Sequence, residues 1–478
     1  MRFKRHAKAI VITLVLAVLG TLLALNLAGG EKRIEVRPQH QYAAGDPQFL
    51  RSMGVLLGPP LTAGNRVTTL VNGDRIFPSM LQAIGDAKST ITFETYIYWS
   101  GEVGRQFAQA LADRARAGVK VHVLVDWVGS QKMDQSLVEL MESAGVELRK
   151  YRPLRWYNLG RLNNRTHRKL LVVDGRVGFT GGVGIADEWT GDAQGPDHWR
   201  DTHFRLEGPA ALQMQATFMD NWTRVTGRVL HGDAYFPPAE TADGAPAAAV
   251  AASATMVDAG SAVRAAPPAA KTPPAAKPAT AGGAVAAAKR DTPAGTQYAQ
   301  VFASSSEGGA ESMHLMYLLA IAAATQTIDL AMAYFVPDEV ITETLVAAMK
   351  RGVRLRVILP NHLIDAGAVR SASRSKWGPL LEAGAEIHEY QPTMYHVKSM
   401  VVDTIFVSVG STNFDPRSFR LNDEANLNVY DADFAREQVR VFEADLAKSR
   451  RITLQAWRAR PWTEKLWEHT MGLASSQL

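Results

Sequence analysis

Two short segments of this chain share one pattern of residues that could carry acid–base and nucleophilic chemistry. The segment HRKLLVVDGRVGFTGG occupies 167–182, and HVKSMVVDTIFVSVGSTN occupies 396–413. Each reads His-x-Lys, four residues, Asp, six residues, and then a Gly-rich pair. The matching positions are His167, Lys169 and Asp174 in the first segment and His396, Lys398 and Asp403 in the second. Two copies on one spacing indicate a duplicated domain and a shared catalytic site.

These residue types suit reactions at a phosphodiester. Such a reaction needs a nucleophile, a proton donor for the leaving alcohol, and cations or hydrogen-bond donors around the nonbridging oxygens. Two imidazoles can supply the nucleophile and the acid, because an unperturbed His has a pKa near ~6.5. Residues two apart on a strand share a face, so each Lys should lie beside its His. Each segment offers only one His and one Lys, and we therefore expect the active site at the seam between two halves.

Asp174 and Asp403 complete the motif and are grouped with its catalytic residues. Both follow a Val-Val pair near the end of an expected strand. Because of this position, we expect them to act structurally, by holding the strand-to-turn geometry through hydrogen bonds.

The elements around the motifs repeat as well. The paired segments are 83–98 with 320–335, 116–126 with 351–360, and 143–151 with 382–390. Each predicts the end of an amphipathic helix, followed by a strand rich in β-branched or aromatic residues. In 116–126 and 351–360 a Gly marks the end of the helix. The recurring β-α-β-α-β order predicts an α/β sheet in each half.

Length and composition restrict the class of protein. A chain of 478 residues with 46% hydrophobic and 21% charged residues suits two globular domains plus accessory segments. The absence of Cys excludes thiolate metal sites, disulfides and a Cys nucleophile. No Walker loop, zinc spacing or dinucleotide fingerprint occurs in a suitable context. A net charge of +5 fits an anionic partner such as a lipid headgroup or nucleic acid, but fits simple solubility equally well.

We divide the chain into four parts: a membrane anchor at 1–30, a first domain at 48–236, a linker at 237–295 and a second domain at 296–478. The linker is dominated by Ala and Pro and contains no aromatic residue. It is therefore expected to be disordered or an extended tether. An Ala-rich helix is the alternative, which the recurrent Pro disfavours.

The N-terminal segment resembles a membrane anchor. Four basic residues precede an apolar run over 9–28, which has about the ~20 residues that a crossing helix needs. A cleaved signal peptide is the alternative, but the run is long and no small-x-small site follows it. The charge bias predicts a cytoplasmic N-terminus and a single-pass protein of the cell (inner) membrane. Its catalytic domains would then lie on the periplasmic or outer side.

The chain resembles the phospholipase D superfamily, and most closely its bacterial cardiolipin synthase branch. The resemblance runs from about Asn72 to about Tyr430, without the Ala/Pro linker. Beyond the His-x-Lys motifs, it rests on WRDTHFRLEG at 199–208, YFVPDE at 334–339, GSTNFDPRSF at 410–419 and LNDEANL at 421–427. The resemblance implies two similar α/β sandwich domains that face each other.

The same resemblance implies a ping-pong reaction through a covalent phosphohistidine, with no metal and no cofactor. His167 would attack phosphorus, and His396 would protonate the leaving alcohol and then deprotonate the acceptor. The symmetry of the motifs leaves the reverse assignment open. Lys169, Lys398 and Asn413 would hold the nonbridging oxygens.

Further site residues follow from the same resemblance. Asp201 and Glu424 would bond the distal nitrogen of each His, and Ser411 and Gly182 belong to the Gly-rich ends of the motifs, around the phosphate. One departure is Gly184, which stands where the family usually has Asn. The phosphate pocket should therefore be asymmetric, unless a backbone N–H in the Gly-rich turn replaces the missing amide.

Other residues near the motifs have two interpretations each. An acyl-chain groove or ordinary core packing could explain the aromatic residues Trp156, Tyr157, Trp189 and Trp199. Arg417 and Ser418 could orient the second motif or touch a headgroup, or Arg417 could form an ion pair. His362 and Asp365 could reach the mouth of the cleft, although a loop role is the default.

The leading hypothesis is a phosphatidyltransferase that joins two phosphatidylglycerols into cardiolipin and releases glycerol. The alternative is a hydrolytic phospholipase D, which would use the same residues. The membrane anchor disfavours a nuclease of the superfamily. The intact motifs disfavour a non-enzymatic lipid-binding scaffold with decayed motifs. We expect phospholipid and membrane as partners, with no nucleic acid and no obligate protein partner.

Overall fold

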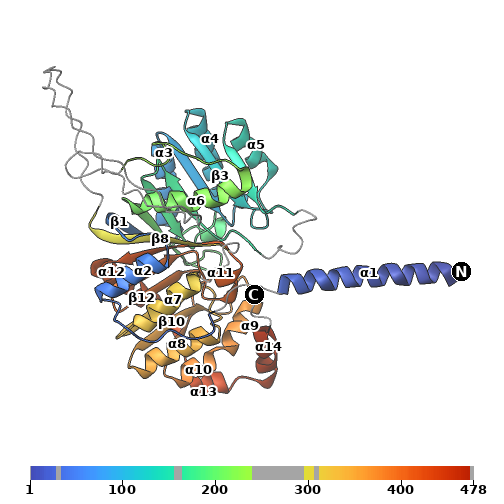
Figure 1. Cartoon of the computed structure of the whole chain (residues 1–478), viewed down its shortest axis with the longest axis vertical. Helices are drawn as coiled ribbons and strands as arrows, with labels where there is room; N and C mark the ends of the chain where they lie inside the picture. Colours follow the sequence, from blue (N-terminus) through green and yellow to red (C-terminus); the bar gives the residue numbers. More distant parts are fainter. Residues whose placement is uncertain (1, 28–33, 155–163, 239–294, 306–311, 474–478) are drawn as a thin grey trace, which may run out of the picture. The chain divides into compact units, whose positions relative to one another are not determined.

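The computed structural model describes residues 2–27, 34–154, 164–238, 295–305 and 312–473 (Figure 1). The predicted linker lies almost wholly outside the described residues, as do Trp156 and Tyr157. The chain begins with α1 (Arg2–Leu27) and α2 (Pro47–Leu56). Within the described part of the chain, no helix combines the length and the hydropathy that a membrane crossing demands.

Two series of helices and strands then follow in nearly the same order. The first consists of β1 (Thr62–Val71), α3 (Gly73–Asp86), β2 (Thr90–Thr95), α4 (Glu102–Arg116), β3 (Lys120–Asp126), α5 (Gln135–Ser143), β4 (Glu147–Tyr151), β5 (Leu170–Val173), β6 (Val177–Gly181), the 3-10 turn η2 (Asp187–Trp189), β7 (Thr202–Glu207) and α6 (Ala210–Thr226). The second consists of β8 (Gln297–Ser304), α7 (Ser312–Ala323), β9 (Thr327–Met332), α8 (Glu339–Lys350), β10 (Arg354–Pro360), α9 (Gly367–Ser375), α10 (Trp377–Glu382), β11 (Glu386–Tyr390), β12 (Lys398–Val402), β13 (Phe406–Gly410), α11 (Pro416–Arg420), β14 (Glu424–Tyr430), α12 (Ala432–Leu446), β15 (Ser449–Ile452), α13 (Leu454–Arg458) and α14 (Trp462–Leu473). The predicted β-α-β-α-β order is confirmed in both halves.

The strands of both halves form one sheet. Its order is β15-β11-β10-β9-β12-β13-β14-β8-β1-β7-β6-β5-β2-β3-β4. From the central pair outward, the sequence of strands is the same on each side, with β15 added at one edge. Strands β1 and β8 pair antiparallel, with Thr62 opposite Ala299 and Asn65 opposite Gln297. The two domains therefore do more than face each other, because a continuous sheet joins them edge to edge.

The motif strands occupy equivalent places in the two halves. Strand β5 pairs antiparallel with β2, and β12 pairs antiparallel with β9. The helices before the neighbouring parallel strands end as the sequence predicts. Gly118 follows α4 with φ +90°, and Gly352 follows α8 with φ +98°. This left-handed conformation favours Gly and turns the chain from helix into strand.

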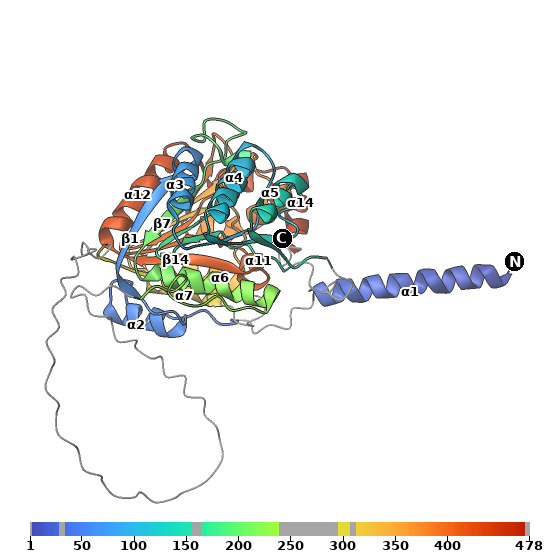
Figure 2. The same ribbon diagram turned by 90° about the horizontal axis from the view of Figure 1, so that it is seen from above.

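Three hydrophobic cores hold this arrangement. One lies under α3, α4 and α5 in the first half, and another under α2, α7, α8 and α10 in the second. The third is shared, since Leu206 and Trp222 of the first half pack in it with Val301, Leu427 and Phe434 of the second. In Figure 2, α3 and α4 lie on one side of strands β1 and β7, and α6 lies on the other. The shared core fixes the position of one motif strand relative to the other.

The two motif Asp residues stabilise the turns at the far ends of β5 and β12. Asp174 accepts hydrogen bonds from the backbone N–H groups of Lys88, Ser89 and Thr90 at 2.7–2.8 Å. Asp403 likewise accepts from the backbone of residues 325–327 at 2.7–2.9 Å. Each Asp carboxylate thus holds the loop that links a helix to the neighbouring strand. The geometry supports the structural interpretation of these residues and gives no support to their grouping with the catalytic ones.

We predict that Asp403→Ala lowers the free energy of unfolding and leaves the chemistry of the folded protein intact. Three backbone N–H groups would lose their acceptor, but water can replace it at the exposed Thr325 and Gln326, so we expect a cost of about 0.5–1.5 kcal/mol. The check is chemical denaturation, with activity measured per folded molecule. Asp174→Ala is the matched variant in the other half. A fully folded Asp403→Ala protein without activity would contradict this interpretation.

Candidate active site

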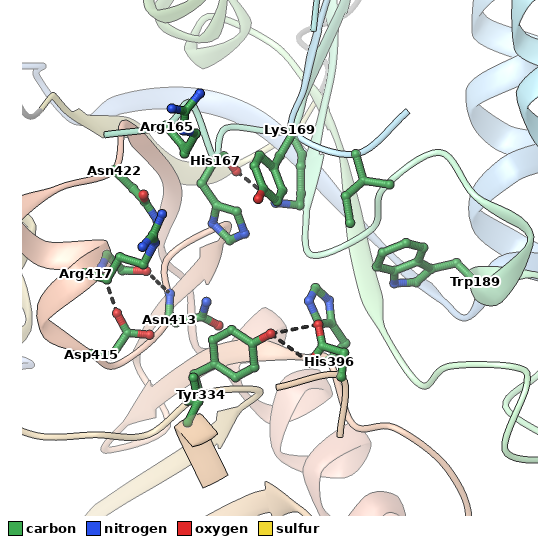
Figure 3. Close-up of a pocket in the computed structure, with 15 residues that line it drawn as sticks. Arg165, His167, Lys169, Trp189, Tyr334, His396, Asn413, Asp415, Arg417 and Asn422 are labelled. Carbon is green, nitrogen blue, oxygen red and sulfur yellow. Dashed lines mark hydrogen bonds between the residues drawn. The ribbon is translucent and has the colours of Figure 1, made fainter. Parts of the chain in front are cut away.

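A cavity of about 330 Å³ lies at the junction of the two halves. His167 and Lys169 line it from the first half, and His396 and Asn413 line it from the second. Figure 3 shows the two imidazole rings directed into the same space. Lys398 does not line the cavity and lies buried beside the His396 ring. The seam thus brings together the residues of both motifs, apart from the two Asp.

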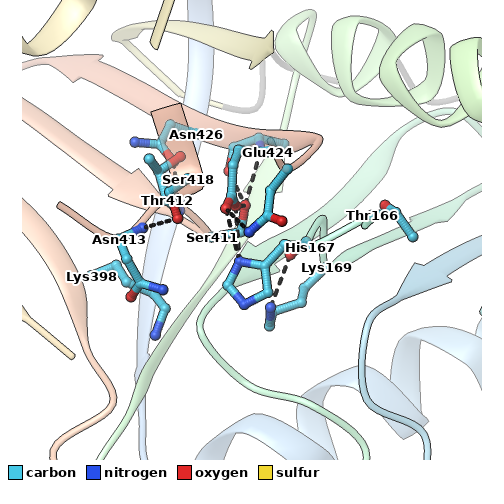
Figure 4. Close-up of polar contacts among 12 residues, drawn as sticks. Thr166, His167, Lys169, Lys398, Ser411, Thr412, Asn413, Ser418, Glu424 and Asn426 are labelled. Atoms are coloured by element: carbon cyan, nitrogen blue, oxygen red, sulfur yellow. Dashed lines mark hydrogen bonds and ion pairs between the residues drawn. The ribbon is translucent and has the colours of Figure 1, made fainter. Parts of the chain in front are cut away.

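A buried carboxylate holds His167. Its Nδ1 lies 3.0 Å from both carboxylate oxygens of Glu424, the first residue of β14 (Figure 4). Burial raises the pKa of Glu424, but His167, Lys169 and the Ser411 hydroxyl outweigh this effect and keep the pKa below its usual value. An ionised carboxylate can only accept, so Nδ1 must carry the proton. The Nε2 atom of His167 therefore has a lone pair available to a ligand.

His396 has an equivalent partner in Asp201. Its Nδ1 lies 2.8 Å from Asp201 Oδ2, which also accepts from Trp189 Nε1 at 2.9 Å. The backbone N–H of Thr202 donates to Asp201 Oδ1 at 2.8 Å. Burial raises the pKa of Asp201, but His396, Lys398 and the Thr202 N–H hold it below its usual value. As in the first motif, the proton stays on Nδ1 and leaves Nε2 with its lone pair.

Both imidazole–carboxylate pairs cross the seam. Glu424 of the second half holds His167 of the first, and Asp201 of the first half holds His396 of the second. The backbone makes the same crossing, because His167 N–H donates to Asp423 O at 2.9 Å and His396 N–H donates to Arg200 O at 2.8 Å. Neither half alone can therefore orient its own imidazole.

The two Lys ammonium groups lie close to their own His residues. Lys169 Nζ donates to His167 O at 2.9 Å, and Lys398 Nζ donates to His396 O at 2.8 Å. Burial lowers the pKa of Lys169 to about 7, with a further contribution from the charge of Lys398. Burial also lowers the pKa of Lys398 to about 8. Two buried cations that lose protons this easily would be stabilised by an anion in the cavity.

Both imidazoles are neutral at pH 7 for the same reason. Burial lowers the pKa of His167 to about 4, against the opposing effect of Glu424. Burial and Lys398 lower the pKa of His396. A neutral imidazole with its Nδ1 proton held by a carboxylate is a competent nucleophile or base at Nε2.

Ser411 and Gly182 support the carboxylates and do not line the cavity. The Ser411 hydroxyl donates to Glu424, and Ala425 N–H donates back to Ser411 Oγ at 3.0 Å. At Gly182 a side chain has no room, because an added Cβ would lie 2.2 Å from Asp201 Oδ1. The Gly182 N–H donates to Thr202 O at 3.3 Å, so it is not available to a phosphate. These two residues were grouped with those that bind the phosphate or support the groups that do, and the geometry favours the supporting role.

The unusual Gly184 is explained by the side chains around it. An added Cβ would lie 2.8 Å from Ile97 Cβ and 3.2 Å from the Trp189 ring. Ile185 N–H donates to Ile97 O, just as Phe414 N–H donates to Tyr334 O, so Ile97 and Tyr334 occupy matching places. The cavity has an apolar wall in the first half where the second half has Asn413 and Tyr334. The predicted asymmetry of the pocket is present, and no backbone group of Gly182 replaces the missing amide.

The remaining sequence candidates divide into two groups. Trp189 and Trp199 pack against His396, with ring centroids 5.3 and 5.6 Å away, and Trp189 is buried. Trp189 both packs in the core and lines the cavity, so the two interpretations of this residue are not exclusive. The residues Asp365, Arg417 and Ser418 line the cavity, whereas His362 does not.

Several lining residues were not proposed as site residues, although Tyr334, Asp415 and Asn422 lie in the motifs that carry the resemblance. They are Tyr96, Ile97, Arg165, Tyr334, Val369, Asp415 and Asn422. Tyr334 OH donates to Asp365 at 2.7 and 2.8 Å, and burial raises the pKa of Tyr334 well above its usual value. The available signal was the repeat itself, since Ile97 and Tyr334 occupy the same place after strands β2 and β9.

We predict that Gly184→Asn, although it restores the family pattern, lowers both stability and turnover. The new side chain would overlap Ile97, and overpacking of this kind costs about 1–3 kcal/mol. Thermal unfolding and steady-state kinetics check the prediction. The double variant Gly184→Asn with Ile97→Ala should regain part of the stability. An unchanged or raised melting temperature for Gly184→Asn alone would show that Ile97 and Trp189 can move to make room for the new side chain.

Comparison with known proteins agrees with this geometry. The family described as "Cardiolipin synthase, PLD-like domain" matches residues 80–208 and 317–446, one match in each half. A cardiolipin synthase of Geobacillus kaustophilus is 32% identical over 88% of this chain and 74% of its own length. Cardiolipin synthase A of Pseudomonas fluorescens is 30% identical over 88% of this chain and 76% of its own.

A solved structure shows the same fold. The phosphatidylserine synthase of Haemophilus influenzae Rd KW20 superposes with a TM-score of 0.61 at 13% identity, and the match covers 90% of this chain and 100% of that one. Two family matches in tandem, together with relatives similar over most of their length, leave one assignment. This chain belongs to the cardiolipin synthase family of phospholipase D-like proteins.

Proposed function

We propose that this protein is a phosphatidyltransferase that joins two phosphatidylglycerol molecules into cardiolipin and releases glycerol. One observation carries the proposal: two neutral imidazoles from opposite halves, each fixed by a carboxylate, open onto one cavity beside two Lys residues. This arrangement suits transfer of a phosphoryl group from one alcohol to another. Relatives similar over most of the chain are cardiolipin synthases by name, which supports phosphatidylglycerol as the substrate.

In the first step, His167 Nε2 attacks phosphorus, and the bond from phosphorus to the glycerol oxygen breaks. His396 gives its Nε2 proton to that oxygen, so glycerol leaves as a neutral alcohol. His396 must be protonated for this, and the arriving phosphate favours its imidazolium form through its negative charge. The product is phosphatidyl-His167 together with free glycerol.

In the second step, a hydroxyl of another phosphatidylglycerol gives its proton to His396 and attacks phosphorus. The bond from phosphorus to His167 breaks, which releases cardiolipin and restores the enzyme. Lys169 and Asn413 line the cavity and would hold the nonbridging oxygens, with Lys398 behind His396. Oδ1 of Asn413 has no hydrogen-bond partner among the described residues, so its amide is free to turn toward a ligand.

Tyr334 and Asp365 supply groups that suit the glycerol headgroup. A carboxylate in a phosphate-binding cavity repels the phosphate itself and accepts hydrogen bonds from hydroxyls. The phenol of Tyr334 already donates to Asp365 and holds it in place. This polar wall favours an alcohol acceptor over water, which speaks for the transferase over the hydrolase.

We also propose that helix α1 anchors the protein in the cell (inner) membrane. Support comes from the apolar run over 9–28 and from the exposure of Ile10, Leu14 and Leu16, at 60–62%. The basic residues before this run favour a cytoplasmic N-terminus. Alkaline extraction of membranes should release a protein that lacks residues 1–30 and retain the full chain. If the membranes retained both proteins, another segment would be sufficient to hold the protein in the membrane.

Product analysis separates the two enzymatic candidates. Purified protein supplied with labelled phosphatidylglycerol should form cardiolipin and glycerol in equal amounts. Accumulation of phosphatidic acid alone would establish the hydrolytic phospholipase D instead. Asp365→Asn should raise the share of hydrolysis, since it weakens acceptor binding and leaves both imidazoles in place. EDTA should leave turnover unchanged.

Replacement of either imidazole should nearly abolish the reaction. We expect His167→Ala and His396→Ala each to lower turnover by a factor of about 10³ or more. With His396→Ala and a substrate with a good leaving group, a phosphatidyl adduct should accumulate on His167. Peptide mapping by mass spectrometry locates it. The two roles would be reversed if the His167→Ala protein formed an adduct on His396 and the His396→Ala protein formed none on His167.

The buried Lys residues predict a particular pH dependence. Their lowered pKa values mean that the free enzyme loses two cations as pH rises through about 7 to about 8, so kcat/KM should fall there. The decline in kcat should occur at higher pH, because bound phosphate stabilises both ammonium groups. His167 stays neutral down to about pH 4 and should not limit kcat/KM above that point. A kcat/KM that rises between pH 7 and 8 would contradict the role given to Lys169 and Lys398.

A further inference from the structure

Helix α14 turns apolar side chains toward solvent. Trp462 is 73% exposed, Leu466 58%, Trp467 57% and Leu473 75%. Trp462, Leu466 and Leu473 follow the helical period and share one side, and Trp467 flanks it. These four residues are called here the outer face of α14. A water-exposed helix ordinarily shows charged residues on this side, and exposed aromatic groups of this density mark interaction surfaces.

The opposite side of α14 carries its acidic residues and is fixed to the body. Glu468 is 4% exposed and forms ion pairs with Arg374 at 2.9 Å and with Arg460 at 3.1 Å. Gly472 also faces inward, since an added Cβ would lie 2.6 Å from Ser375 Oγ on α9. The ion pairs hold α14 with its charged side inward, and its apolar residues therefore point outward.

The helix lies close to the cavity. Met471 of α14 packs in a cluster with Val336, Val369 and Tyr334. Both Val369 and Tyr334 line the cavity, so a single layer of side chains separates α14 from it. Figure 1 shows α14 beside α9.

The surrounding sequence is basic. Residues 448–473 contain six Lys and Arg against two Glu. The two Glu are those that form the inward ion pairs with Arg374. Arg450 and Arg458 form ion pairs with Glu389 and Glu382, so the excess positive charge comes from Lys448, Arg451 and Lys465. Exposed Trp and Leu next to an excess of basic charge match the interface of an anionic bilayer, where aromatic rings lie at the headgroup level.

We propose that the outer face of α14 docks on the surface of an anionic phospholipid bilayer, with the helix in the plane of the interface. This inference rests on the proposed function for its purpose, because a lipid substrate must reach the cavity from a bilayer. Docking through α14 brings Tyr334 and Val369, and with them the cavity, next to the headgroup layer. It is a contact separate from the anchor proposed for α1.

The absence of Cys allows a direct test on the full chain. Leu466→Cys, labelled with an environment-sensitive fluorophore, should brighten with vesicles of phosphatidylglycerol and phosphatidylcholine, and nitroxide lipids should quench it. Val229→Cys is the matched control, since Val229 is also apolar and 61% exposed but follows α6. The control label should not respond. An unresponsive label at 466 would overturn the proposal, as would a signal that rises with protein concentration without lipid, which would show contact between two copies.

Kinetics distinguish a failure of docking from a failure of the proposed function. Trp462→Ser with Trp467→Ser should lower turnover of phosphatidylglycerol in vesicles by about tenfold, as expected when interfacial residues are lost. Turnover of a dispersed short-chain phosphatidylglycerol should stay unchanged, because neither Trp touches the cavity. An equal loss on both substrates would overturn the docking role. If the wild-type protein transfers neither substrate, the proposed function fails, while the fluorescence result still decides docking.

Discussion

The active site depends on two imidazole–carboxylate pairs that each span the seam between the halves. Because Glu424 and Asp201 stay ionised, each holds a proton on the Nδ1 of the opposite His and exposes a lone pair at Nε2. A buried carboxylate is tolerated only where donors surround it, and these two have several. The site and the assembly of the halves are therefore stabilised by the same contacts.

The surrounding structure keeps these pairs aligned. The backbone of each His bonds across the seam, and Arg200 reaches Asp445 through two hydrogen bonds of 2.9 and 2.7 Å. Bidentate pairs of this kind set orientation as well as distance. The shared core and the β1–β8 pair then make the two halves one rigid frame. Small shifts between the halves would misalign both imidazoles at once.

Much of the fold and of the active site could be predicted from the sequence, because the two halves repeat each other and can be compared. The repeat identified His167, His396 and their Lys residues, and it gave the order of strands around them. The carboxylates Asp201 and Glu424 followed from the resemblance to the family, and each bonds the Nδ1 atom of a His. The sequence could not predict that each carboxylate bonds the His of the opposite half, since a repeat in the sequence does not show which half a side chain faces. Their catalytic roles remain predictions.

Other features of the site could not be predicted, because they depend on residues that are distant in the sequence. Gly182 was grouped with residues that bind the phosphate or support the site, and only the structure shows that Asp201 fills the space beside it. Gly184 predicted an asymmetric pocket, but only the structure shows that Ile97, 87 residues earlier, fills the place of a side chain there. Tyr334 and Asp365 meet only in three dimensions. These features depend on contacts between residues far apart in the sequence, and the spacing of residues along the chain does not reveal such contacts.

The central strand pair has a consequence for how the protein is made. When synthesis has completed α6, strand β8 does not yet exist, and β1 has an open edge on one side. The nascent first half also lacks Val301 and Leu427, which later cover Trp222 and its neighbours. An open edge next to uncovered apolar surface invites aggregation. The ribosome-bound chain therefore passes through a stage that is prone to aggregation until its second half emerges.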